Sequence, residues 1–249
     1  MFSTFAHFSW SQNCVHGFCT LLKRIFEIRE PSMSIPSLVL EIEHIMVSLR
    51  LLLASVWLPS YVLKGEVDRV AAATTDAIRS LLKELAPDEL QKVSKEIKTP
   101  SGSIEERRAV MAANHSLLLK ALSDGIGRDR AVEVGRETLY NVGVSIGEES
   151  RKRLGVGDSV EDLFTAARVM YSVLGIRFTV DREGEDHRIE VYRCPLSKQY
   201  SEFTCTVTSA IDEGVFKGLN PKASISFKRK ITSGFPTCMA NVTISSGGA

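Results

Sequence analysis

Apolar residues recur at the spacing of an α-helix over the first two-thirds of the chain. A stripe of apolar positions over residues 67–85 falls on one helical face, which predicts a helix there. Ser103, followed three residues later by Glu106, forms a capping box that marks the start of another helix. Further helices are predicted over 87–97, 103–122 and 128–154, and from the cap at 158 or 159 to 174.

The period of the pattern changes from helical to alternating after Gly175. The segments that follow are strands over 176–180 and 189–191, a helix over 200–211, a loop over 214–221, and strands over 223–231 and 238–244. A polar turn over 182–186 joins the two strands of a hairpin. The fold class is therefore predicted to be α+β, with N-terminal helices followed by a β-β-α-β-β antiparallel sheet that helices cover on one face.

These changes in pattern divide the chain into three parts. Residues 1–32 are rich in phenylalanine without a clear period, and we expect a poorly ordered extension there. Residues 33–127 form a helical region, and residues 128–249 form the α+β domain. Cys14, His16 and Cys19 in the extension fit no common zinc spacing.

The most apolar run of the chain is Leu51–Leu63, which contains Pro59. A bilayer span needs about 20 residues, so this run is too short to cross a membrane. It is interpreted as a buried or dimer-forming helix. The alternative is a helix that associates with a membrane surface or contacts an acyl chain.

The overall charge narrows the class of partner. The 31 basic and 30 acidic side chains give a net charge of +1, so no bulk field attracts nucleic acid. The five cysteines are an odd number, which favours reduced thiols and a cytoplasmic location over a secreted disulfide framework. The first 30 residues show no basic region followed by a long apolar run and a small-residue cleavage site, so we do not expect a signal peptide there.

Three cysteines near the C-terminus are the main candidate for chemistry. Cys194 ends a predicted strand, Cys205 lies off the apolar stripe of a helix, and Cys238 faces the core of the last strand. Three thiolates suit zinc or iron, with His187 or His115 as a fourth ligand. Two alternatives remain open: unlinked core cysteines, and a nucleophile at Cys194 or Cys205 activated by a helix N-terminus or a histidine.

Other candidate residues surround these thiols. The helix that carries Cys205 also carries Glu202, Asp212 and Glu213, which are candidates for a general base. The predicted helix over 128–154 contains three glycines, which indicate close approach of another helix or of a ligand. A basic strand is interpreted as an edge that charge protects, with anion binding as the alternative, and its residues are Lys222, Lys228, Arg229 and Lys230.

Residues from about 128 to 245 resemble a known group of domains. The stretches that carry the resemblance are GRETLYNVGVSIGEESRKRLGV, SVEDLFTAARVMYSVLGIRFTV and RCPL…FTCTVTSAIDEGVFKGLNPKASISFKRKITSGFPTC. They resemble the vinyl-reductase-type (4-vinyl reductase) small-molecule-binding domain and its relative, the aminothiazoline carboxylate hydrolase-like family. Cys194, Cys205 and Cys238 match the three cysteine positions of that group. Loop elements match at Gly214, Asn220, Pro221 and Gly234.

The resemblance implies a fold related to haem-nitric-oxide-binding and vesicle-tethering subunits, with a pocket for small apolar molecules and frequent dimers. The segment Ser233–Pro236 lacks the acidic residue usual after the glycine, which separates this chain from the hydrolase pattern.

Three hypotheses of function follow. The first is a protein that binds or senses a small apolar or cyclic molecule in a pocket bordered by the cysteines, with or without a metal. The second is a hydrolase of the aminothiazoline carboxylate type, acting on C–N or C–S bonds. The third is a homodimeric structural adaptor.

Overall fold

A computed structural model of the chain describes residues 50–183 and 186–245. The predictions for residues 1–32, including Cys14, His16 and Cys19, lie outside these ranges. After a short helix over 50–56, the described elements are α3 (Ser60–Leu85), α4 (Pro87–Val93), α5 (Ile104–Ile126), α6 (Arg128–Leu154), α7 (Val160–Val173), β1 (Arg177–Glu183), β2 (Asp186–Arg193), the 3₁₀ helix η1 (Pro195–Lys198), α8 (Glu202–Leu219), β3 (Ala223–Arg229), the 3₁₀ helix η2 (Ile231–Ser233) and β4 (Cys238–Ile244).

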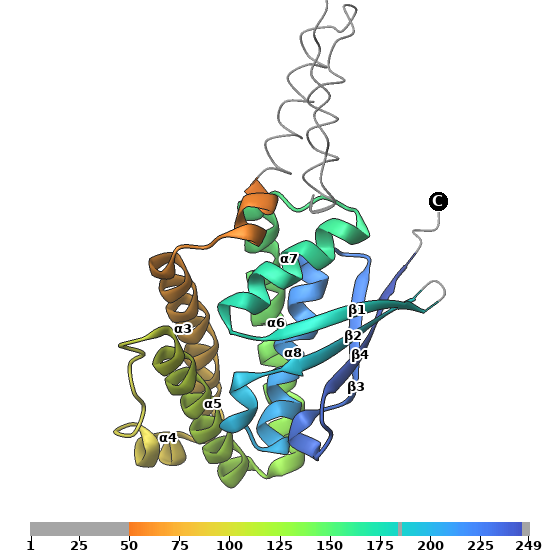
Figure 1. Cartoon of the computed structure of the whole chain (residues 1–249). Helices are drawn as coiled ribbons and strands as arrows, with labels where there is room; N and C mark the ends of the chain where they lie inside the picture. The colour runs from red at the N-terminus through yellow and green to blue at the C-terminus, as the bar shows by residue number, and fades with distance from the viewer. Residues whose placement is uncertain (1–49, 184–185, 246–249) are drawn as a thin grey trace, which may run out of the picture.

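The four strands form one antiparallel sheet in the order β1-β2-β4-β3. Buried and exposed residues alternate along β3 and β4, so the sheet has one core face. Figure 1 shows α6, α7 and α8 beside the sheet and α3, α4 and α5 gathered at the far side of the molecule. The predicted α+β class and the β-β-α-β-β order are confirmed. The basic strand β3 lies at a sheet edge, as predicted.

Local signals in the sequence fix several helix ends. The Ser103 hydroxyl accepts from the Glu106 backbone N–H at 3.2 Å, and the Glu106 carboxylate accepts from the Ser103 N–H at 2.7 Å. This is the predicted capping box, and it satisfies two backbone donors that the first turn of α5 leaves free. Gly155 ends α6 with a φ of 68°, a left-handed conformation that glycine adopts without strain.

The predicted loop over 214–221 is wrong, because α8 continues to Leu219. The glycines that suggested a loop instead allow α8 to pack against α6. A Cβ atom on Gly214 would lie 2.1 Å from the Tyr140 carbonyl oxygen, and one on Gly143 would lie 2.3 Å from the Ile211 carbonyl oxygen. Gly143 and Gly147 on α6 therefore mark the close helix approach that was predicted.

The apolar run Leu51–Leu63 does not form a single helix. The first helix ends at residue 56, and α3 begins at Ser60 with Pro59 as its cap. Leu51 is buried, whereas Trp57 is 72% exposed and Tyr61 is 75% exposed. The run therefore contributes only in part to the core, and its dimer and membrane-surface interpretations stay predictions. No helix in 50–183 or 186–245 is long and apolar enough to cross a bilayer.

Two clusters of buried apolar side chains form the core. The larger one packs the sheet against α7 and α8 and includes Met111 of α5. The smaller one lies among α3, α5, α6 and the start of α8, around Leu82, Leu122 and Val207. Side chains from before and after Arg128 contribute to both clusters. The site described next lies along the larger cluster.

Candidate functional site: a cavity beside α8

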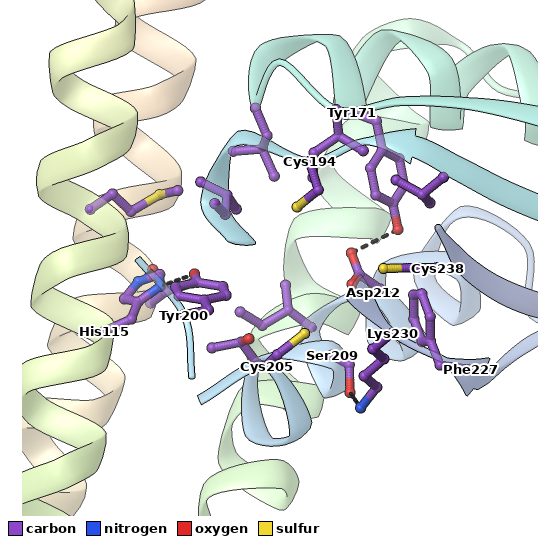
Figure 2. A pocket seen from close by; sticks show the side chains of 18 of the residues that line it. His115, Tyr171, Cys194, Tyr200, Cys205, Ser209, Asp212, Phe227, Lys230 and Cys238 are labelled. Atoms are coloured by element: carbon purple, nitrogen blue, oxygen red, sulfur yellow. Dashed lines mark hydrogen bonds between the residues drawn. The ribbon is translucent and has the colours of Figure 1, made fainter. Parts of the chain in front are cut away.

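A cavity of about 100 Å³ lies between α3 and α5 on one side and α8 and the sheet on the other. Figure 2 shows His115 and Tyr200 at one side of it and Asp212, Cys238 and Lys230 at the other. Most of its wall is apolar. The lining residues are Val70, Thr74, Met111, His115, Tyr171, Leu174, Ile176, Val191, Cys194, Leu196, Tyr200, Cys205, Thr208, Ser209, Ile211, Asp212, Phe227, Lys230 and Cys238.

The three predicted cysteines all line this cavity. Cys194 follows the end of β2, Cys205 lies in the first turns of α8, and Cys238 begins β4. The sheet register places Cys238 opposite Val191. The thiol of Cys238 also accepts a hydrogen bond from the Ile231 backbone N–H at 3.3 Å. Their convergence follows from the fold, since two of them flank neighbouring strands and the third faces them from α8.

Burial keeps these thiols protonated. It raises the pKa of Cys194 to about 12 and raises the pKa values of Cys205 and Cys238. The raised pKa weighs against the alternative that a helix N-terminus activates Cys194, since η1 has only four residues and desolvation has the larger effect. An unactivated thiol is a poor nucleophile.

Neither histidine candidate for a fourth metal ligand presents a free ring nitrogen to the cavity. His187 on β2 does not line the cavity, and its ring packs on Phe164 with centroids 5.1 Å apart. His115 lines the cavity, but both of its ring nitrogens have hydrogen-bond partners. The described residues contain no group of three or more His, Cys, Asp or Glu side chains arranged to hold a metal. The zinc or iron site at Cys194, Cys205 and Cys238 stays a prediction.

Asp212 provides the one carboxylate of the cavity wall. The Tyr171 hydroxyl of α7 donates to its Oδ1 atom at 2.7 Å. Burial raises the pKa of Asp212 to about 6, against the opposing effects of this hydrogen bond and of Lys230. The carboxyl group therefore changes protonation near neutral pH, which is the range in which a general acid or base works.

The other two candidate bases on α8 have structural partners. Glu213 accepts two hydrogen bonds of 2.8 Å from Nη2 of Arg136 on α6, one at each carboxylate oxygen. Glu202 accepts from the Ser233 hydroxyl at 2.9 Å and lies in the first turn of the helix. Neither lines the cavity. Of the three predicted carboxylates, only Asp212 belongs to the site.

A buried chain of hydrogen bonds closes the opposite wall. The Thr74 hydroxyl donates to the Val70 carbonyl oxygen at 2.7 Å and therefore accepts from Nε2 of His115, also at 2.7 Å. Nδ1 is then the unprotonated nitrogen, and it accepts from the Tyr200 hydroxyl at 2.7 Å. Burial lowers the pKa of His115 to about 4, so the ring is neutral. This chain fixes Tyr200 at the cavity wall.

Lys230 supplies the positive charge of the site. It follows β3, and its ammonium group donates to the Ser209 hydroxyl at 3.1 Å and lies 6.0 Å from the centroid of Phe227. Lys230 was predicted only as part of a charged edge. Lys230 reaches the cavity wall because of the direction of the chain between β3 and β4, and the sequence pattern alone does not predict that direction.

One signal in the sequence marks the polar face of α8. Cys205, Ser209 and Asp212 recur at i, i+4 and i+7 along the helix, and all three line the cavity. This stripe lies next to an otherwise apolar helix surface that includes Val207 and Ala210. The same spacing rule that located Cys205 therefore also identifies Asp212.

A second, smaller cavity of about 70 Å³ adjoins the first. The two share Tyr171 and Asp212 in their walls, and the smaller one also reaches Glu66 and Arg69 on α3. The Tyr171–Asp212 hydrogen bond thus lies at the boundary between the two spaces.

Comparison with known proteins gives one match by sequence family. A family model described as L-2-amino-thiazoline-4-carboxylic acid hydrolase matches residues 104–241, more than half of the chain. This range contains all three cysteines and Asp212. No curated protein matches the chain.

The solved structures that are similar in part include the following two. One is trafficking protein particle complex subunit 3 from Naegleria fowleri covalently bound to palmitic acid, with 14% identity, a TM-score of 0.43, and coverage of 56% of this chain and 95% of that one. The other is the phenol-responsive sensory domain of the transcription activator PoxR with phenol, with 16% identity, a TM-score of 0.42, and coverage of 65% and 90%.

Proposed function

This chain belongs to the L-2-amino-thiazoline-4-carboxylic acid hydrolase family, and we propose that it binds a small cyclic molecule in the cavity beside α8. The membership confirms the resemblance to the aminothiazoline carboxylate hydrolase-like group. The observation that carries the proposal is a largely apolar cavity with a half-buried carboxylate in its wall, Asp212, which accepts a hydrogen bond from Tyr171. Apolar walls with a few convergent polar groups are typical of small-molecule sites.

The charges of the wall suit the compound in the family's name. An amino-thiazoline carboxylate carries an amidine-like group, which is a planar donor of hydrogen bonds, and a carboxylate, which is an acceptor. Asp212 can accept from the first and Lys230 can donate to the second, and both line the cavity. The apolar wall would contact the ring and its sulfur atom.

We expect the wild-type chain to bind L-2-amino-thiazoline-4-carboxylic acid in a calorimetric titration at pH 7.5. Asp212→Asn keeps the size of the side chain and removes its charge. The loss of one charge-assisted hydrogen bond is worth about 1.5–3 kcal/mol, so the dissociation constant should rise about tenfold to hundredfold.

Glu213→Gln is the matched control. It makes the same chemical change one residue away, at a carboxylate that pairs with Arg136 instead of lining the cavity. It should leave the affinity unchanged. Equal weakening by both variants, or no effect of Asp212→Asn, would contradict Asp212 as the anchor.

Hydrolysis of the bound ring is a second candidate function, favoured by the pKa of about 6 at Asp212. A carboxylate with this pKa can take a proton from water as the water adds to the amidine-type carbon. Asp212 then returns this proton to the leaving sulfur or ring nitrogen as the C–S bond or the ring C–N bond breaks. The cysteines are weaker candidates for a nucleophile, since burial raises the pKa of each thiol.

Product chemistry tests this second function directly. Cleavage of the C–S bond releases a thiol, and cleavage of the ring C–N bond releases an amine, so a thiol reagent and an amine reagent distinguish the two. We expect the rate to rise with pH through about 6, as Asp212 loses its proton, and to fall at least a hundredfold in Asp212→Asn. If the protein binds the compound without consuming it, the binding function stands and hydrolysis of this substrate is excluded.

A further inference from the structure

Four arginines gather around a hollow on the surface, away from the polar wall of the cavity. The hollow has a volume of about 530 Å³ and is lined by Arg108 of α5, Arg168 of α7, Arg177 of β1 and Arg193 of β2. We call these four residues and the hollow the arginine groove. An adjoining hollow of about 310 Å³ shares Arg108 and Arg193 and adds Lys198. Glu105 is the one acidic residue in the lining of either hollow.

Two of these arginines are partners at the irregular end of the β1–β2 pair, where the register shifts between Arg177 and Phe178. The register of β1 and β2 pairs Arg177 with Arg193. Like charges at facing positions of neighbouring strands destabilise a sheet. Within 50–183 and 186–245, neither of these side chains forms an ion pair with a carboxylate, nor does that of Arg168. The groove therefore concentrates positive charge that the described part of the chain does not neutralise.

Arg108 is held rigidly at the base of the groove. Its Nε donates to the Val173 carbonyl oxygen at 2.7 Å, and its Nη2 donates to the Ser172 carbonyl oxygen at 2.9 Å. The side chain is only 10% exposed, and its Nη1 lies 3.8 Å from a carboxylate oxygen of Glu105, which is 76% exposed. A guanidinium fixed by two backbone carbonyls loses little further entropy when an anion binds.

We propose that the arginine groove binds a phosphate group of a soluble phosphorylated molecule or of a lipid headgroup. Guanidinium groups match the oxygen geometry of phosphate through paired hydrogen bonds. Several guanidinium groups around one hollow favour a multiply charged phosphate over a single carboxylate. An anion between Arg177 and Arg193 would also offset the repulsion across the β1–β2 pair. Ile176 lines both the groove and the cavity, so the two sites share a wall.

Inorganic pyrophosphate is the probe for the first experiment, in a calorimetric titration at low ionic strength. We expect saturable binding that weakens as salt is added. Arg177→Gln and Arg193→Gln should each weaken the affinity about tenfold or more, and the double variant should abolish binding. Arg130→Gln is the control, because Arg130 is an exposed arginine of α6 that pairs with Glu133 outside the groove.

Thermal unfolding separates loss of the site from loss of the fold. Removing either charge of the facing pair should raise the melting temperature by about 1–4 °C without ligand, since the repulsion disappears. Sedimentation with vesicles of phosphatidylcholine and phosphatidylglycerol then identifies the source of the phosphate. Binding to either probe that depends on Arg177 and Arg193 supports the proposal. No binding to either, or equal binding by the double variant, overturns it.

Discussion

Replacing Gly214 with alanine is expected to lower the free energy of unfolding by about 3 kcal/mol or more. The added Cβ atom would lie 2.1 Å from the Tyr140 carbonyl oxygen and 2.7 Å from the Val144 backbone nitrogen. These are backbone atoms of α6, so no side-chain rotation relieves the overlap and the two helices must separate. Urea unfolding followed by circular dichroism measures the loss. The variant should also bind the cavity ligand more weakly, because Asp212 lies two residues from the contact.

Gly65→Ala is the matched control for this prediction. Gly65 lies inside α3, and a Cβ atom there would meet nothing within 4 Å. Alanine has a higher helix propensity than glycine, so this variant should be more stable by about 0.5–1 kcal/mol. Destabilisation of similar size at both positions would show that the tight α6–α8 contact is not the cause at Gly214.

The elements with strong local signals were the ones that sequence could predict. The Ser103–Glu106 capping box, the α6 boundaries and the alternating strands all depend on neighbours within a few residues. The end of α8 was missed for a different reason. Gly214 and Gly218 look like breaks in a local pattern, and only the contact with α6 explains why a helix continues through them. That contact joins segments about 70 residues apart.

The site was predictable in part for the same reason. The helical spacing of α8 and the strand alternation of β4 place Cys205 and Cys238 at the site, and the i+7 spacing from Cys205 favours Asp212 over Glu202 and Glu213. Partners from elsewhere in the chain separate them: Tyr171 for Asp212, Arg136 for Glu213 and Ser233 for Glu202. The pKa of Asp212 is raised mainly by desolvation in the folded protein, and the spacing of residues along one helix does not reveal that desolvation.

Asp212→Asn is expected to make the protein more stable above pH 7, by about 3 kcal/mol, while it weakens ligand binding. The pKa of Asp212 is raised from 3.8 to about 6 in the folded state, which corresponds to about 3 kcal/mol. Below pH 3.8 both states hold the proton and the folded state has no penalty. As pH rises from 3.8 to about 6, the unfolded state ionises while the folded state keeps its proton, so stability falls over this range and the loss is complete above it. Asparagine can still accept from Tyr171 but cannot ionise.

The stability contribution of His115 depends on pH in the opposite direction to that of Asp212. Asp212→Asn should therefore change the shape of the curve of unfolding free energy against pH. Burial lowers the pKa of His115 from 6.5 to about 4. The neutral buried ring therefore carries no free-energy penalty above pH 6.5, and stability is lost as pH falls from 6.5 towards 4. In the wild type the two slopes oppose each other between pH 4 and 6. In Asp212→Asn the opposing Asp212 slope is gone and the His115 slope remains, so the free energy of unfolding should rise steeply over that range. Urea unfolding at pH 4.5, 5.5, 6.5 and 8 measures both profiles. A constant difference between the two proteins at all four values would contradict a raised pKa at Asp212.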